Sequence, residues 1–394
     1  MFSHKIHHRK WPLAALLCAA LAACGGSDGG DTGTRTQVNA VKVFGDSLAD
    51  SGTFGIKFTV QGNLIYPERV AQSFGLGTGC NFYAFNGTTF AANTAVGCNN
   101  FAIGGGVING TASGYGPTDP RGIGVQLATA STAGVRGDYL PTDLVLIDGG
   151  GNDAATLVGA YLRAPTDGGA AYLAVLGTLL SGAQMAPIAT ACAAPASAAC
   201  SAALAGGGNT YMSALADSFY NMIKTQALDK GARKVAVLNM PGITNTPRFQ
   251  FVLAGIQAQA GAAARTQSEA LFKSWVVSFN SQLATRFSGN KSVAIVDFYT
   301  SFNDQITTPG QFSLTNVTTP ACPVVGTGSD GLPAYSFPTC TSASLSAQTP
   351  PSGATGGADW WKTYAFSDSF HPTPYGHQLL AQLISRTLAQ AGWL

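Results

Sequence analysis

The sequence predicts an α/β fold in which helices cover both faces of a central parallel sheet. Five short apolar runs have the length and composition of buried strands, at 41–44, 100–103, 143–148, 234–239 and 292–297. Stretches with apolar residues at helical spacing separate these runs, and that alternation is typical of parallel sheets. Because 46% of the 394 residues are hydrophobic and only 10% are charged, the chain can fill a large core.

Helices are expected between the strands, at 67–74, 125–133, 154–162, 170–186, 212–228, 262–287 and 375–391. Three other stretches are rich in small and turn-forming residues and are interpreted as loop-like insertions, at 75–99, 189–208 and 302–365. We find no internal repeat and no linker to a second domain. The insertion at 302–365 could form a small cap.

The amino terminus has the pattern of an export signal. A basic start is followed by an apolar segment, 11–23, which is too short to span a bilayer comfortably. The segment ends in LAACG at 21–25, which resembles a bacterial lipobox with Cys24 as the lipidated residue. We therefore expect a lipoprotein-type signal at 1–24 and a flexible tether at 25–40. An ordinary cleavable signal with a chance cysteine is the alternative.

This interpretation predicts an exported protein whose lipid anchor attaches it to the cell envelope. The outer membrane is preferred because Gly25 is not the acidic residue that favours retention at the inner membrane. Secretion is the alternative. Removal of the signal leaves 18 basic and 19 acidic residues, with no basic cluster. A nucleic-acid partner is not expected, because such binding depends on neutralising phosphates.

Six cysteines lie beyond the signal, two in each insertion. An even number of cysteines in an exported chain predicts disulfides. Pairing of sequence neighbours is favoured because each pair brackets one insertion, although other pairings stay open. The favoured pairs are Cys80–Cys98, Cys192–Cys200 and Cys322–Cys340. None of these cysteines has zinc-ligand spacing with histidines, so neither a metal nor another cofactor is expected.

Four polar clusters suggest ester chemistry. Three of them follow apolar runs: Gly45 to Ser47, Gly104 to Gly106, and Gly150 to Asp153. The fourth, Asp368 to Pro372, precedes the last expected helix. A serine attacks an ester only if a base takes its proton, and the oxyanion that forms needs fixed donors. Glycine N–H groups and an asparagine amide can be those donors. The alternative for Asp46 or Ser47 is a simple helix cap.

Two histidines remain after the signal, so few bases are available to Ser47. His371 has Asp368 three residues before it, and a carboxylate at that spacing can orient the imidazole. His377 falls within the last expected helix and has no adjacent carboxylate, so a packing or surface role is favoured for it.

Taken in order, the four clusters resemble the motif blocks of the GDSL esterase/lipase family, also called SGNH hydrolases. The blocks are FGDSLADSG at 44–52, NFAIGG at 100–105, GGND at 150–153 and DSFHP at 368–372. The resemblance covers 41–394 and implies a hydrolase domain there. It also implies a flavodoxin-like three-layer α/β/α sandwich, which the disulfide-bearing insertions would decorate.

The resemblance implies a role for each block. Ser47 would be the nucleophile of a carboxylic ester hydrolase that forms an acyl-enzyme, with His371 as its base and Asp368 as the orienting acid. The Ser47 N–H, the Gly105 N–H and the Asn152 side chain would form the oxyanion hole, with Gly104 and Gly106 as alternatives for the glycine. No role is assigned to Asp148.

Two other functions stay open, an acyltransferase that uses the same site and a non-catalytic lipoprotein that binds lipid or carbohydrate. The expected substrate is a small-molecule or lipid ester, but acyl length and oligomeric state cannot be read from the sequence. Aromatic residues of the last insertion could line an acyl pocket, although a small core of the insertion itself is favoured. They are Phe302, Phe312, Tyr335, Phe337, Trp360, Trp361 and Tyr364.

Overall fold

A computed structural model describes Met1 and residues 37–93, 95–132, 135, 137–194 and 197–394. Thr36 to Leu394 form one compact unit, which contains every strand and helix described below. The expected signal with Cys24, and most of the expected tether, lie outside the described residues. Of the helices described, none combines the length and apolar character that a bilayer crossing requires.

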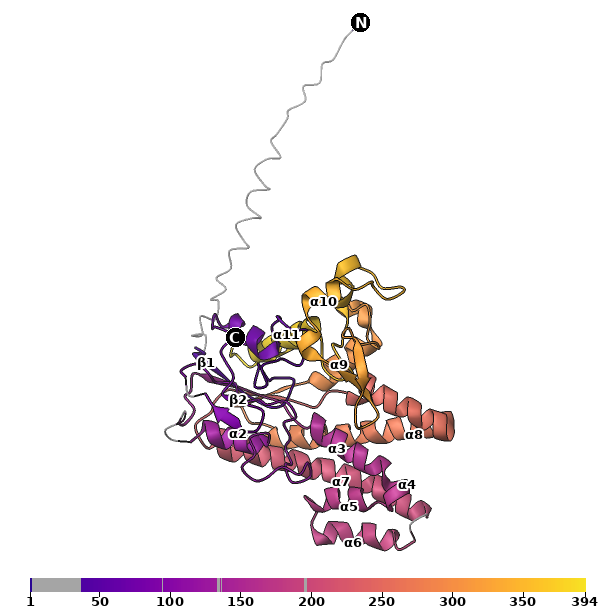
Figure 1. The fold of residues 1–394 in the computed structure, drawn as a ribbon. Helices are drawn as coiled ribbons and strands as arrows, with labels where there is room; N and C mark the ends of the chain where they lie inside the picture. The colour runs from indigo at the N-terminus through magenta and orange to yellow at the C-terminus, as the bar shows by residue number, and fades with distance from the viewer. Residues whose placement is uncertain (2–36, 94, 133–134, 136, 195–196) are drawn as a thin grey trace. The chain divides into compact units, whose positions relative to one another are not determined.

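A parallel sheet forms the centre of this unit (Figure 1). Its strands lie in the order β1-β4-β5-β6 and correspond to four of the expected strands. Phe44 pairs with Ile147, Ile147 with Val237, and Val237 with Ile295. The strands are β1 (Ala40–Phe44), β4 (Asp143–Ile147), β5 (Val235–Leu238) and β6 (Val293–Val296).

The expected strand at 100–103 was wrong as a regular strand, although this segment does run beside β1. Asn100 makes an isolated parallel bridge to Val43, and the N–H of Phe101 donates to the carbonyl of Val43 at 2.8 Å. The side chain of Asn100 accepts the N–H of Ala102 at 3.0 Å and so occupies a donor that a strand would use. Counting this segment, the spatial order is the 2-1-3-4-5 of flavodoxin-like sheets.

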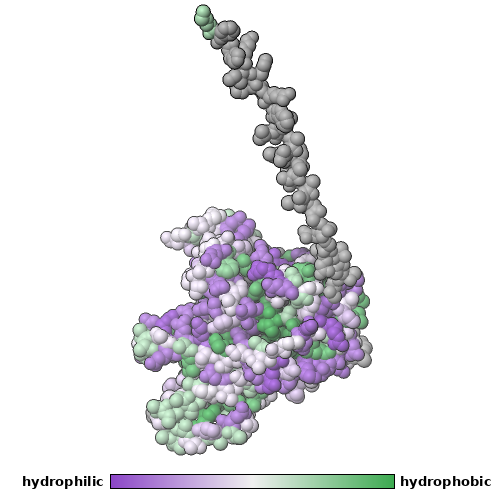
Figure 2. All heavy atoms as spheres, turned by 180° about the vertical axis from the view of Figure 1, so that it is seen from behind, coloured by the Kyte–Doolittle hydropathy of each residue, from purple (hydrophilic) through white to green (hydrophobic). Residues whose placement is uncertain are grey.

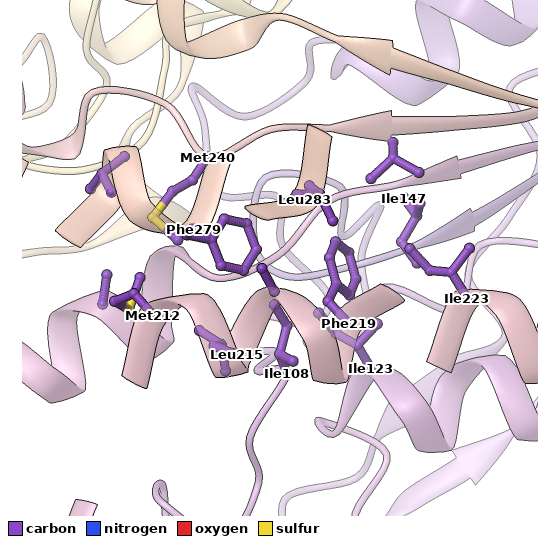
Figure 3. Packing of buried hydrophobic residues seen from close by; sticks show 14 of the residues in the cluster. Ile108, Ile123, Ile147, Met212, Leu215, Phe219, Ile223, Met240, Phe279 and Leu283 are labelled. Atoms are coloured by element: carbon purple, nitrogen blue, oxygen red, sulfur yellow. The ribbon is translucent and has the colours of Figure 1, made fainter. Parts of the chain in front are cut away.

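Helices cover both faces of the sheet, so the three expected layers are present. Side chains alternate along β4: Val145 and Ile147 join one core cluster, while Leu144 and Leu146 join the other. Figure 3 shows Ile147 beside Phe219 and Leu283 in the first cluster. That cluster is covered by α2 (Ile123–Ala130), α3 (Gly151–Leu162), α5 (Ala170–Gly177), α6 (Gly182–Ala191), α7 (Ala198–Ile223) and α8 (Pro247–Phe287). The second is covered by α1 (Tyr66–Ser73), α9 (Phe298–Thr307) and α11 (Pro374–Gln390).

Several helices differ from their expected bounds. The single helix expected at 170–186 is divided into α5 and α6, because Ser181 caps a new helix by accepting the N–H of Gln184. The insertion at 189–208 is largely helical rather than loop-like, because its many alanines favour helix. Cys200 lies in one of these helices, α7. α8 begins at Pro247 rather than near residue 262, and its two parts meet at Gly261. Figure 2 shows an apolar surface on the lobe formed by α4 (Ala164–Asp167), α5 and α6, and the sequences of these helices are rich in alanine.

Each insertion contains one disulfide between sequence neighbours. The bonded pairs are Cys80–Cys98, Cys192–Cys200 and Cys322–Cys340. Cys322 and Cys340 belong to a third, small core cluster with Trp360, Trp361 and Tyr364, so part of the last insertion packs on itself. Two hairpins were not expected from the sequence. They are β2 (Tyr83–Phe85) with β3 (Phe90–Ala92), and β7 (Val324–Thr327) with β8 (Pro333–Tyr335).

The remaining elements are short. They are α10 (Ser342–Ser346), a π-helical turn at Lys224–Leu228, and 3₁₀ turns at Ile243–Asn245, Pro309–Phe312, Phe337–Thr339 and Gly357–Thr363.

Candidate active site

Ser47 lies in a tight turn directly after β1, at the carboxyl edge of the sheet. The turn is closed by the carbonyl of Asp46, which accepts the N–H groups of Ala49 and Asp50 at 3.1 Å each. The segment at 100–103 lies on one side of β1 and β4 lies on the other, so the order of the strands reverses at β1. Ligands of open α/β sheets bind where the strand order reverses. The fold therefore presents a hydroxyl where a ligand would bind.

The structure brings Ser47, His371 and Asp368 together. The Nε2 atom of His371 is 2.7 Å from Oγ of Ser47, across 324 residues of chain. The Nδ1 atom of His371 lies 2.9 Å from Oδ2 and 3.0 Å from Oδ1 of Asp368. Nδ1 therefore donates to the carboxylate, which leaves the lone pair of Nε2 to accept the serine proton.

Asp368 is held by its own loop. Its Oδ1 atom accepts the N–H groups of Phe370 at 2.8 Å and His371 at 2.6 Å. Burial alone would raise the pKa of this carboxyl, but the charge of His371 and these hydrogen bonds hold the pKa below its usual value. Asp368 is therefore a carboxylate at neutral pH.

Aromatic rings flank the imidazole. The ring centroid of His371 is 5.2 Å from that of Phe58 and 5.7 Å from that of Phe337. Phe58 also packs edge-on against Phe337 at 5.5 Å. These contacts limit the rotation of the imidazole and keep it aimed at Ser47.

The glycine turn at 104–106 contains one free backbone donor. The N–H of Gly104 donates to Oδ2 of Asp50 at 2.8 Å, and that of Gly106 donates to the carbonyl of Ile103 at 2.9 Å. Among the described residues, no acceptor is bonded to the N–H of Gly105 or to that of Ser47. Of the three glycines, Gly105 is thus the one whose N–H can meet a ligand.

Asn152 faces the same space from the first turn of α3. Its Nδ2 atom donates to the carbonyl of Gly106 at 2.9 Å and is 3.5 Å from Oδ2 of Asp46. One hydrogen of the amide is used by Gly106, and the second makes only the long contact with Asp46, which a ligand oxygen in the cleft could replace. Ser47, Gly105, Asn152 and His371 line one cleft of about 320 Å³, which we call the outer cleft.

Close packing behind Ser47 requires glycine at two positions. A Cβ on Gly106 would lie 2.5 Å from the carbonyl oxygen of Gly45, so the glycine turn can approach the serine turn only without a side chain. Gly45 has φ +148°, and a Cβ there would lie 2.0 Å from Oδ1 of Asp148. These two glycines let both neighbouring loops contact the serine turn.

Asp148, to which the sequence assigned no role, anchors the serine turn. Its Oδ1 atom accepts the N–H of Asp46 at 3.0 Å, and its Oδ2 atom accepts the hydroxyl of Tyr66 at 2.7 Å. Gln126 holds the same turn by two hydrogen bonds to the backbone of Gly45, at 2.9 and 3.0 Å. No local pattern could reveal these partners, because they are 81 to 102 residues apart in the chain.

Asp46 and Asp148 form a buried pair of carboxyls with unusual proton affinity. Burial, and then the charge of Asp148, raise the pKa of Asp46 to about 8. Burial raises the pKa of Asp148 to about 6, although hydrogen bonds from Tyr66 and Asp46 oppose that rise. Asp46 therefore holds a proton at neutral pH, whereas an unfolded chain would release it.

This proton affinity predicts a pH-dependent stability. Between pH 6 and 8 the folded chain retains the proton of Asp46 and the unfolded chain does not, so the free energy of unfolding should fall as pH rises. At about 1.4 kcal/mol per pH unit, the fall would be about 2–3 kcal/mol. Asp46→Asn should remove this fall in the free energy of unfolding, as measured by urea unfolding at pH 6 and at pH 8. The exposed Asp359→Asn is the control, and equal pH dependence of Asp46→Asn and the wild type would disprove the assignment.

His377 does not reach Ser47. It is fully buried in α11, its Nδ1 atom accepts the N–H of Tyr66 at 3.3 Å, and its ring stacks on that of Tyr66 at 6.4 Å. Burial, followed by the charge of His371, lowers the pKa of His377 to about 3. It is a neutral packing residue, as favoured from the sequence.

The aromatic residues of the last insertion are divided between the two expected roles. Tyr335 lines the outer cleft and Phe337 contacts His371, while Phe302 lines a second cavity beside Ser47. Trp360, Trp361 and Tyr364 form the small core of the insertion, and Phe312 packs on the second sheet cluster.

Comparison with known proteins places the chain in a family. Solved structures similar to it include phospholipase A1 from Streptomyces albidoflavus NA297, at 14% identity over 88% of this chain and 98% of that one, with a TM-score of 0.37. An extracellular lipase from Streptomyces rimosus has 15% identity over 88% and 99% of the two chains, with a TM-score of 0.34. Because both TM-scores are below 0.5, these structures carry no argument about this chain, and its family assignment rests on the comparison of sequences. No curated protein matches the chain. The model of the family described as GDSL-like Lipase/Acylhydrolase matches residues 41–384, so the chain belongs to that family and is an ester-bond hydrolase.

Proposed function

We propose that the protein is a serine-dependent carboxylic ester hydrolase in which Ser47 is the nucleophile, His371 the base and Asp368 the orienting acid. The observation that supports this most is the 2.7 Å contact between Ser47 and His371, with the second imidazole nitrogen on the Asp368 carboxylate. A serine, an imidazole and a carboxylate in this sequence of contacts can pass a proton from the serine to a leaving group.

In the proposed reaction, Oγ of Ser47 attacks the ester carbonyl carbon while its proton passes to Nε2 of His371. The tetrahedral intermediate then expels the alcohol, which takes that proton, and an acyl ester on Ser47 remains. Water attacks this acyl-enzyme and gives its proton to His371. Collapse of the second intermediate releases the carboxylic acid and returns the proton to Ser47.

The oxyanion of both intermediates is proposed to accept hydrogen bonds from three donors. They are the N–H of Ser47, the N–H of Gly105 and Nδ2 of Asn152. The support is that the two backbone groups have no acceptor within the described part of the chain, and that all three residues border the outer cleft. Each donor of this kind contributes about 3–4 kcal/mol of transition-state stabilisation.

Covalent labelling tests the assignment of the nucleophile. We expect a fluorophosphonate to add one phosphonyl group per chain, and peptide mass analysis to locate it on Ser47. Prior denaturation should abolish labelling, since only the folded site activates the hydroxyl. A label on another serine of the native protein would refute the proposal.

We also propose that the chain is exported and carries a lipid anchor on Cys24. The support is the lipobox-like LAACG at 21–25, together with three disulfides, which are typical of oxidising compartments. An alkyne fatty acid fed to producing bacteria should label the wild-type chain and not Cys24→Ser. Equal labelling of both would exclude this anchor.

A further inference from the structure

Ser47 and His371 separate two spaces of different character. The outer cleft is bordered by polar and charged groups, including Arg248 and Asp368. A second space of about 80 Å³, which we call the inner cavity, is also lined by Ser47 and His371. Its wall is largely apolar and includes Leu48, Leu238, Ile243, Phe298, Phe302 and Phe366.

The wall of the inner cavity belongs to the packed framework of the protein. Leu238 ends β5, and Phe298 and Phe302 lie on α9, which follows β6. The rings of Phe298 and Phe302 lie 5.7 Å apart, and Phe302 and Phe366 lie 6.0 Å apart. Such a wall keeps its shape when a ligand binds, because most of its residues belong to the second core cluster and Ile243 belongs to the first.

The inner cavity offers little to a polar ligand. Asp46, Asp148 and Gln305 also line the cavity, but each has a partner inside the protein. Asp148 accepts the N–H of Asp46 and the hydroxyl of Tyr66, Asp46 accepts the N–H of Leu48, and Gln305 donates to Ser301. The amide of Asn239 donates to Asp297 and accepts from the N–H of Tyr299, and the hydroxyl of Thr246 donates to the carbonyl of Ile243. Among the described residues, the buried side-chain polar atoms without a partner belong to Ser51, Tyr139 and His377, and none of these lines the cavity. A hydrocarbon chain suits such a wall better than a sugar or a charged headgroup does.

We propose that the inner cavity binds the acyl chain of the substrate, so that the protein acts on esters of medium-chain fatty acids. This inference rests on the proposed roles of Ser47 and His371. The ester carbonyl would lie at Ser47 with its oxygen toward Gly105 and Asn152, and the alcohol would leave through the outer cleft. A water-sized group needs about 10–15 Å³ of cavity volume, so the 80 Å³ of the inner cavity hold an acyl chain of about five to eight carbons.

The chain-length dependence of kcat/KM tests the proposal. With p-nitrophenyl esters from acetate to laurate, below their micelle concentrations, the wild type should gain about fourfold in kcat/KM per added methylene. The gain should stop at about five to eight carbons, where the cavity is full. An equal rate for acetate and octanoate, in a protein that a fluorophosphonate still labels at Ser47, would overturn the acyl site and leave the proposed hydrolase intact. Hydrolysis that survives in Ser47→Ala would instead overturn the proposed function.

Two residues of α9 allow the cavity to be changed in opposite directions. Phe302→Ala should extend the favoured acyl chain by about two to four carbons, given the room that the lost ring leaves. Gln305→Phe should restrict hydrolysis to acyl chains of about four carbons or fewer, because it fills the same space. Phe312→Ala is the matched control, since Phe312 packs on the same core cluster but does not line the cavity. A shift in Phe312→Ala equal to that in Phe302→Ala would overturn the proposal.

Wild-type protein provides a test that does not depend on folding of the variants. Second-order inactivation rates by fluorophosphonates with ethyl, hexyl, octyl and dodecyl chains should rise up to the octyl reagent and fall for the dodecyl reagent. Rates that continue to rise to dodecyl, or that do not depend on the chain, would contradict an acyl site of this size.

Discussion

Ser47→Ala is expected to lower kcat for ester hydrolysis by about 10⁵ to 10⁶-fold, because no other group in the proposed mechanism can form the acyl-enzyme. The remaining activity would come from the oxyanion donors and from substrate binding alone, with water as the nucleophile. Since alanine removes one oxygen atom from a turn whose backbone hydrogen bonds are kept, KM should change little. Initial rates with p-nitrophenyl butyrate, at enzyme concentrations high enough to detect the loss, measure this effect.

Ser51→Ala is the matched control for this substitution. Ser51 lies four residues further on in the same block, and its Oγ atom is buried without a partner among the described residues. The substitution removes the same atom from the same block, but Ser51 lines neither the outer cleft nor the inner cavity, so Ser51→Ala should retain kcat within a few-fold. If a folded Ser47→Ala protein hydrolysed the ester at the wild-type rate, Ser47 would not be the nucleophile.

Asp368→Asn is expected to have the second-largest effect, a decrease of about 10⁴-fold in kcat. Oδ1 of Asp368 already accepts two backbone N–H groups, so an asparagine at this position should keep its oxygen there. Its amide would then replace Oδ2 and place a donor 2.9 Å from Nδ1 of His371, while the remaining oxygen, Oδ1, is already shared with two backbone N–H groups. The imidazole would change to the tautomer with the proton on Nε2, which cannot accept a proton from Ser47.

The control for this substitution is Asp359→Asn, which changes an exposed carboxylate of the same insertion that is paired with Lys362. Circular dichroism and thermal unfolding should show that both variants are folded. The kinetic signature is a loss of kcat with KM nearly unchanged, since Asp368 contacts His371 rather than the substrate. A loss of less than about tenfold would mean that another group orients the imidazole.

The tertiary structure also explains why several contacts of the candidate site could not be predicted. The clusters at 44–52, 100–105, 150–153 and 368–372 are local patterns at the ends of strands or before a helix, and the sequence was sufficient to find them. The choice among Gly104, Gly105 and Gly106 depended on Asp50, whose carboxylate takes the N–H of Gly104 across 54 residues. The segment at 100–103 had the composition of a strand, yet the Asn100 side chain competes for its backbone donors.

The sequence by itself determined the α/β class, the four clusters and the pairing of Ser47 with one of two histidines. These features can be read from the sequence because the periodicity of apolar residues and the small turn residues are patterns over a few positions. The small number of histidines is a property of the composition. Only the tertiary structure decided that Asp148 and Tyr66 support the serine turn, that His377 is buried away from it, and that an apolar cavity lies behind Ser47. Those features depend on which surfaces meet when helices pack on a sheet, and close packing between distant segments leaves no mark in any short stretch of sequence.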